Sequence, residues 1–315
     1  MKNKVVVIGS YNVDMTIKTK KIPSPGETVI GGSFSTGGGG KGANQAIAAA
    51  RLGADVSFIA RVGSDLLGQE AIKKLNDEHI DTRFIFRDKQ LPTGVAFIVV
   101  DDSAENSIVV ASGANAALSV EDIENVKVEL LSADILLVQL ESPVETIKSA
   151  IKIAKQNGAT VILNPAPAQK LDTDILTNID IITPNIVEAE MLTGIKAIDA
   201  DSLKKIVSKF FEYGIKNVFI TMGSKGYFAG LINASVIVPA YKVTSVDTTG
   251  AGDVFSGSLA AFLAEGIPIE MAARMANGAA SISVTRIGAQ NSAPKKAEVE
   301  EFMMSHNIVE SEISN

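Results

Sequence analysis

The chain has 315 residues, of which 46% are hydrophobic and 21% are charged, and this length suits one large α/β domain or two ordinary domains. Its formal net charge of −7 argues against a nucleic-acid partner, and no apolar run approaches the about 20 residues of a membrane span, so we expect a cytoplasmic protein. The absence of cysteine excludes disulfides, thiolate metal sites and a cysteine nucleophile.

From the N-terminus onward, short apolar runs alternate with amphipathic segments. Continuous β-branched runs predict buried strands at residues 5–8, 56–60, 135–139, 160–163, 179–183 and 218–221. Helices are predicted between them at residues 45–52, 142–157 and 202–213, each followed by a glycine. This order predicts an α/β fold in which a mostly parallel sheet is flanked by helices, within a single domain of residues 1–315.

Two insertions, at about residues 12–38 and 92–111, break this alternation. Both contain short alternating strands and turn residues, such as Pro25-Gly26 in the first and Asp101-Asp102 in the second, but no helix. Neither insertion could form a core alone. We predict that they pair into a small antiparallel β-sheet that lies over one edge of the domain as a lid.

A glycine-rich loop at residues 37–44 (GGGGKGAN) fits two interpretations. It contains a formal G-x-G-x-x-G, but a dinucleotide fold places that motif directly after the first strand. The Walker pattern fails because Gly42, rather than Ser or Thr, follows Lys41. The loop either brings its backbone and Asn44 close to a polar ligand or serves as a flexible hinge of the lid. The formal G-x-G-x-x-G leaves a dinucleotide-dependent oxidoreductase as one alternative function, although the position of the loop argues against it.

A second glycine-containing segment, residues 247–253 (DTTGAGD), precedes an apolar helix predicted at residues 254–264. Its glycines leave the N–H groups of the helix N-terminus bare, where they and the helix dipole can hold phosphate oxygens. Asp253 could accept a proton from a hydroxyl beside these amides, which is the arrangement that phosphoryl transfer needs. Alternatively, Asp253 only complements the helix dipole, which is worth ~0.3–1 kcal/mol.

Three further carboxylates follow predicted strands. Asn185 and Glu188 have the spacing of a capping box, so Glu188 either caps a helix or lies near a hydrated magnesium ion. Ser142 and Glu145 fit a cap in the same way. Glu141, which ends a strand, is freer to face a ligand.

Seven motifs, taken in order, resemble those of the ribokinase family of carbohydrate and nucleoside kinases over essentially the whole chain. They are residues 9–14 (GSYNVD), 25–28 (PGET), 39–45 (GGKGANQ), 139–143 (QLESP), 164–168 (NPAPA), 183–185 (TPN) and 247–253. The resemblance implies a ribokinase-like fold and phosphorylation of the primary 5-hydroxyl of D-ribose by ATP, with Mg2+ and an activating K+. A related kinase for deoxyribose, another sugar or a nucleoside is the alternative, and a catalytically silent sugar-binding protein is a further one.

The resemblance also implies roles for individual residues. It implies a sugar seat made of Asn12, Asp14, Gly40, Lys41, Asn44, Ala96, Ile108, Glu141 and Asp253. It implies that Asp253 is the catalytic base, with an anion hole made of Gly250, Ala251 and Gly252. It implies nucleotide contacts from Asn185, Thr221, Gly223, Gly226, Gly252 and Asn277.

The metal sites are implied in the same way. Glu188 matches an acid linked to magnesium through water. A monovalent-cation site is implied at Asp247, Thr249, Ser283, Arg286, Gly288 and Ser292. The implied partners are a sugar and ATP, with no nucleic acid and no membrane. Because open strand edges are a liability unless covered, we predict a homodimer in which two lids pair.

Overall fold

The computed structural model of the chain describes residues 3–103, 105–232, 234–306 and 311–312. Position 104, in the second predicted insertion, and both ends of the predicted 1–315 domain lie outside these residues. Within the described residues, one sheet has the strand order β14-β13-β12-β11-β10-β9-β8-β1-β4-β5. Its strands are β1 (Lys4–Ile8), β4 (Asp55–Gly63), β5 (Ile85–Asp88), β8 (Ile135–Val138), β9 (Thr160–Leu163), β10 (Ile181–Ile182), β11 (Asn217–Thr221), β12 (Tyr227–Leu231), β13 (Ala234–Val238) and β14 (Ser311–Glu312).

This sheet is parallel from β5 to β11 and antiparallel from β11 to β14. The six predicted strands correspond to β1, β4, β8, β9, β10 and β11, so the prediction of a mostly parallel sheet is confirmed. Parallel strands bring their carboxyl ends to one edge, where open α/β sheets bind ligands.

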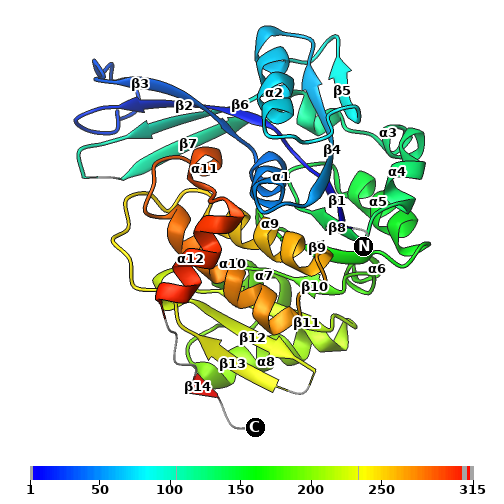
Figure 1. Cartoon of the computed structure of the whole chain (residues 1–315). Coiled ribbons are helices and arrows are strands. Elements are labelled where there is room, and N and C mark those ends of the chain that lie inside the picture. The colour runs from blue at the N-terminus through cyan, green and yellow to red at the C-terminus, as the bar shows by residue number, and fades with distance from the viewer. Residues whose placement is uncertain (1–2, 104, 233, 307–310, 313–315) are drawn as a thin grey trace.

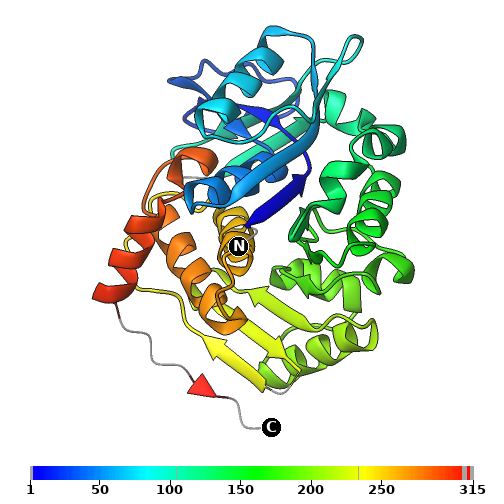
Figure 2. The same ribbon diagram turned by 45° about the vertical axis from the view of Figure 1, so that its right-hand side comes forward.

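Helices cover both faces of the sheet, because successive residues of the central strands are apolar and point to opposite faces. Val5 and Val7 of β1 belong to one buried cluster, whereas Val6 and Ile8 belong to the other. The first cluster packs under α1 (Lys41–Arg51), α2 (Leu66–Asp77), α9 (Ala251–Ala264), α10 (Ile269–Ser283) and α12 (Lys296–Ser305). The second packs under α3 (Val120–Asn125), α4 (Lys127–Leu131), α5 (Val144–Lys155), α6 (Thr173–Leu176), α7 (Ile186–Thr193) and α8 (Ala200–Glu212). Figure 2 shows the orange and red helices on one side of the sheet and the green helices on the other.

Three short helical segments complete the described chain, namely η1 (Gly113–Ala117), η2 (Gly223–Lys225) and α11 (Ala289–Ser292). All four predicted helix starts differ from the observed ones, and α8 begins at Ala200 rather than at residue 202. α1 begins at Lys41 rather than at residue 45, because Gly40 adopts a φ of 87° and turns the chain directly into the helix. α9 likewise begins at Ala251, after Gly250 with a φ of 76°. α5 has Pro143 as its N-cap and no side-chain cap, so the predicted cap at Ser142 is wrong.

The two insertions form one four-stranded sheet that projects from the main domain at the upper left of Figure 1. Its order is β3 (Phe34–Gly39), β2 (Asn12–Lys18), β6 (Gly94–Val100) and β7 (Asn106–Ala111). Pairing is antiparallel within each hairpin, as expected, and the two hairpins join through a parallel pair, β2 with β6. We call this sheet the lid.

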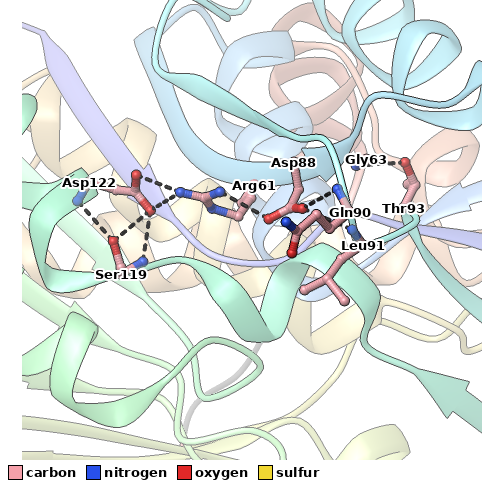
Figure 3. Close-up of polar contacts among 8 residues, drawn as sticks. All are labelled: Arg61, Gly63, Asp88, Gln90, Leu91, Thr93, Ser119 and Asp122. Carbon is pink, nitrogen blue, oxygen red and sulfur yellow. Dashed lines mark hydrogen bonds and ion pairs between the residues drawn. The ribbon is translucent and has the colours of Figure 1, made fainter.

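An ionic network fixes the point where the chain enters the second lid hairpin (Figure 3). The guanidinium of Arg61, on β4, contacts Asp122 at 2.6 Å and Asp88 at 3.0 Å. Asp88 Oδ1 in turn accepts hydrogen bonds of 2.8 Å from the backbone N–H groups of Gln90 and Leu91. These contacts bind the segment that precedes β6 to the rigid end of β4, so the base of the lid is anchored to the main sheet.

Candidate active site

The candidate site is a cleft at the carboxyl ends of the central parallel strands. It lies between the N-termini of α1 and α9 and the strand ends that follow β9, β10 and β11. Its lining residues are Lys41, Asn164, Ala166, Thr183, Asn185, Glu188, Thr221, Thr248, Gly250, Ala251, Gly252 and Asp253. Within the described chain, no helix has the length and apolar character needed to cross a membrane.

Asp253 is the most buried acid of this cleft and lies in the first turn of α9, with 5% of its surface exposed. Asn44 Nδ2 donates to its Oδ2 at 2.9 Å, and Gln45 Nε2 donates to its Oδ1 at 3.0 Å. Burial raises the pKa of Asp253, and this effect is opposed by the positive charge of Lys41 and by the two amide donors. Each carboxylate oxygen retains lone-pair capacity for a further hydrogen bond, as a general base requires.

The N-terminus of α9 supplies backbone donors beside this carboxylate. Gly250 is the N-cap, and it has a left-handed conformation and no capping side chain. The first N–H groups of a helix have no partner within the helix. Ala251 N donates instead to Thr248 O at 3.2 Å. An anion bound in the predicted hole would therefore compete with the Thr248 carbonyl for the Ala251 N–H group. The N–H groups of Gly252 and Asp253 follow in the same turn, where the helix dipole favours an anion.

The predicted sugar-binding residues of the lid share one of its faces. The strand register pairs Asp14 with Ala96, and Ile98 with Ile108. Residues that are directly paired, and residues two apart on one strand, point to the same side of a sheet. Asn12, Asp14, Ala96 and Ile108 therefore lie on the same face, although Ala96 is buried and Ile108 is half exposed.

Acidic side chains surround the amino end of α1. Glu141 Oε2 accepts hydrogen bonds from Ser10 Oγ and from Lys41 N, the latter at 3.0 Å. Burial raises the pKa of Asp14 to about 6, and the negative charge of Glu141 adds to this rise. The pKa of Lys41 is also raised, chiefly by the charge of Asp253. A lysine cation thus lies among carboxylates, as hydroxyl and phosphate recognition requires.

The side-chain amides of Asn12 and Asn44, both in the implied sugar seat, differ in the hydrogen bonds that their oxygen atoms accept. Asn115 Nδ2 donates to Asn12 Oδ1 at 2.8 Å, and Asn115 Oδ1 accepts from Tyr11 N at 3.0 Å. Asn115 thereby orients Asn12, and the sequence analysis missed it, because the two residues are far apart in the chain and Asn115 lies in no recognised motif. Among the described residues, the buried Asn44 Oδ1 has no hydrogen-bond partner, so it is available to a ligand hydroxyl.

The implied nucleotide residues divide into two groups. Asn185 and Thr221, which are joined by an isolated β-bridge, line the cleft, and so does Gly252. Gly223, Gly226 and Asn277 do not line this cleft. Gly226 has a backbone reason to be glycine, since a Cβ there would lie 2.0 Å from Val238 O. Asn277 Nδ2 donates to Pro239 O at 2.9 Å.

Glu188 caps α7 and also lines the cleft. The capping box is present, with Glu188 Oε2 accepting from Asn185 N at 2.8 Å and Asn185 Oδ1 accepting from Glu188 N at 2.9 Å. Glu188 is nevertheless buried and lines the cleft, and burial raises its pKa. Among the described residues, no cluster of three or more His, Asp or Glu side chains could hold a metal ion alone. One carboxylate beside substrate phosphates still fits Mg2+, which usually keeps several waters.

Asp247 connects the two segments that carry the implied monovalent-cation residues. Its Oδ1 accepts from Thr249 N at 2.9 Å, and its Oδ2 accepts from Gly288 N at 2.8 Å. The hydroxyls of Ser283 and Ser292 each donate to a backbone carbonyl three residues earlier. Arg286 is paired with Glu298. Asp247 thus joins the segment before α9 to the segment before α11, and the implied residues lie in these segments or in the two helices that flank the second.

The glycine-rich loop of residues 37–44 does not follow β1, as a dinucleotide site would require. It ends the lid strand β3 and begins α1. Asn164, Ala166, Thr183 and Thr248 line the cleft within motifs to which the sequence analysis gave no individual role. Asn164, Ala166 and Thr183 follow the ends of β9 and β10, and Thr248 directly precedes α9; these positions are signals that could have found them.

Known proteins are similar to this chain over nearly its whole length. Residues 2–296 match the pfkB family carbohydrate kinase profile. The ribokinase of Haemophilus influenzae is 46% identical over 303 residues, which are 96% of this chain and 99% of that protein. The deoxyribokinase of Salmonella typhi is 37% identical over 95% of this chain and 98% of its own length. The structure of Arabidopsis thaliana ribokinase complexed with ribose and ATP has a TM-score of 0.89 at 32% identity, covering 96% of this chain and 99% of that one.

Proposed function

Because the chain belongs to the pfkB family of carbohydrate kinases, we propose that it transfers the γ-phosphoryl group of ATP to the primary 5-hydroxyl of D-ribose. The observation that carries this proposal is the buried carboxylate of Asp253 beside the bare amino end of α9. A base and an anion-binding helix terminus meet there at one point of the cleft.

In the proposed reaction, the ribose hydroxyl donates its proton to Asp253 as its oxygen attacks the γ-phosphorus. The bond from the γ-phosphorus to the bridging oxygen breaks, and ADP leaves. The Gly252 amide, the dipole of α9 and the Lys41 ammonium stabilise the negative charge that spreads over the phosphoryl oxygens. Positioned base catalysis contributes about 10²- to 10⁴-fold. Closure of the lid excludes water, which would otherwise compete as acceptor.

Ribose is favoured over deoxyribose by similarity and by the chemistry of the seat. Identity is 46% to a ribokinase and 37% to a deoxyribokinase, over nearly equal lengths. Asp14, Glu141 and Asn44 together offer many acceptors for sugar hydroxyls. A kinase for deoxyribose is the alternative that a substrate panel would reveal.

The same proposal assigns two cations. Glu188 would hold magnesium through water, and magnesium when bound would neutralise phosphate charge. Asp247, Thr249, Ser283, Arg286, Gly288 and Ser292 would surround K+, chiefly through backbone carbonyls. What supports the second assignment is the pair of hydrogen bonds with which Asp247 joins its two segments.

We also propose a homodimer that forms through the lid. One face of the lid packs on the core near its base through Val13. Farther out, the same face carries Phe97 and Val109, whose exposed fractions are 51% and 68%. Directly paired positions place these two side chains on the same face. Neighbouring exposed apolar side chains mark an interaction surface.

The cytoplasmic location expected from the sequence remains a prediction.

The first experiment is ribose-dependent ADP release from Mg-ATP in a potassium buffer, with deoxyribose, a hexose and a nucleoside as parallel acceptors. We expect the highest kcat/KM with ribose and a loss of rate when K+ is replaced by a large organic cation. Turnover with deoxyribose that exceeds turnover with ribose would overturn the substrate assignment. Ribose binding without turnover on any of these acceptors would favour the catalytically silent sugar-binding protein.

A further inference from the structure

A chain of buried amides lies behind the proposed base. Gln45 is fully buried on α1, one residue after Asn44. Its Nε2 donates to Asp253 Oδ1 and to Asn164 Oδ1, each at 3.0 Å. Its Oε1 accepts from Gln139 Nε2 at 2.6 Å. The carboxamide of Gln45 thus uses both of its N–H groups and its oxygen without any water.

The orientation of this chain of amides is determined by a backbone carbonyl. Asn164 Nδ2 donates to Thr183 O at 3.0 Å, and a carbonyl can only accept. The Asn164 side chain must therefore turn its oxygen toward Gln45. Gln45 in turn must point its NH2 group toward Asn164 and Asp253, because an oxygen there would face two acceptors. Gln139, which donates to the other end of Gln45, reinforces the same orientation.

This geometry has a consequence for the carboxylate. A fixed NH2 donor binds Asp253 Oδ1 only when that oxygen accepts, which favours the ionised form over the acid. It also fixes the plane of the carboxylate, because Asn44 holds the other oxygen. The charged groups that act on Asp253 from neighbouring elements are Lys41 of α1, Glu141 after β8, Glu188 of α7 and Asp14 of the lid. Three of these four groups are acids, whose negative charges disfavour ionisation of Asp253. The neutral amides of Asn44 and Gln45 favour the ionised carboxylate without adding a further charge to the site.

We propose that Gln45 is a positioning residue, which holds the Asp253 carboxylate in the orientation and ionisation state that proton abstraction requires. Gln139 and Asn164 act through Gln45 and set the direction of its amide. This inference rests on the proposed role of Asp253 as base. Gln45 is fully buried and does not line the cleft, so its effect should be on kcat rather than on substrate affinity.

The test compares Gln45→Met and Gln45→Glu with the unaltered protein. Methionine has a similar length but no donor, so kcat should fall about 10- to 100-fold while KM for ribose and ATP stays within about threefold. The acid limb of the kcat/KM profile should move to higher pH, because loss of a donor to the carboxylate raises its pKa. Glutamate should move the limb further, since two carboxylates about 3 Å apart cannot both ionise.

Matched variants separate this effect from simple loss of stability. Ser256→Ala removes a buried hydroxyl contact of 2.9 Å to Thr183, one turn farther along α9, and should lower the melting temperature without moving the pH profile. Gln139→Met should shift the limb in the same direction as Gln45→Met but less, and it replaces that variant if Gln45→Met does not fold. An unmoved acid limb in the folded Gln45 variant would overturn the inference. Asp253→Asn separates a failure of the Gln45 proposal from a failure of the proposed function, because an active Asp253→Asn would refute the assignment of Asp253 as the base.

Discussion

Replacing Asp253 with asparagine should nearly abolish turnover while leaving the fold intact. The base contributes about 10²- to 10⁴-fold, which corresponds to about 3–5 kcal/mol of transition-state stabilisation at ~1.4 kcal/mol per decade. The structure predicts a second loss. Asn44 and Gln45 both donate to this carboxylate, at 2.9 and 3.0 Å, but an asparagine has only one oxygen to accept. One donor must therefore face an NH2 group, so the side chain would also lose its orientation.

The stability of this variant should change little. An unsatisfied buried donor costs about 1–3 kcal/mol, but removing a buried negative charge offsets that cost. The assay is coupled ADP release across ribose and ATP concentrations, together with thermal unfolding and calorimetric ribose binding. Ser256→Ala on the same helix is the control for a local packing change. A folded Asp253→Asn with kcat within tenfold of the unaltered protein would refute the reasoning.

Three further predictions concern the lid and the cations. Asp14→Asn should raise the free energy of unfolding at pH 7 by up to about 3 kcal/mol, at ~1.4 kcal/mol per pKa unit, and raise the ribose KM. The sign follows from the raised pKa: the folded protein binds the extra proton, so this contribution to stability is lost as pH rises from about 4 to about 6. Urea unfolding at pH 4 and 7 should therefore show a larger loss of stability for the unaltered protein than for Asp14→Asn. Glu188→Gln should raise the magnesium concentration needed for half-maximal rate more than the ribose KM, and the opposite result would leave Glu188 as a helix cap alone. Phe97→Glu should convert a dimer into monomers in sedimentation velocity, and a protein that is monomeric at micromolar concentration before substitution would remove the lid-pairing proposal.

The features that the sequence predicted well are those encoded over short stretches of chain. β-branched runs predicted the central strands, because burial on both faces needs apolar residues at every position. Asp253 and the glycines before it lie within four residues, so their joint chemistry could be inferred before the structure. Gly252 and Thr221 were expected at the nucleotide side, and both line the cleft.

The features that the sequence did not predict depend on contacts between distant segments. Gln45 contacts Gln139 and Asn164 only because the fold places the N-terminal part of α1 beside the carboxyl ends of β8 and β9. Ser142 matched a local capping pattern, yet tertiary packing made Pro143 the N-cap and buried the serine hydroxyl without a partner. Local patterns identify what a residue can do, whereas the topology decides which partner it meets.

The glycines show the same dependence on three-dimensional context. Gly39 lies in the loop that the sequence predicted either to approach a polar ligand or to act as a hinge, and a Cβ at this position would lie 2.2 Å from Asp14 Oδ1. A Cβ at Gly9 would lie 2.1 Å from Gln139 Oε1. In both places the missing side chain makes room for a polar group of the site or of its supporting amides. The glycine positions in these motifs therefore follow from the close packing of Asp14 and Gln139, and an alanine at either position would displace a polar side chain before it affected any ligand.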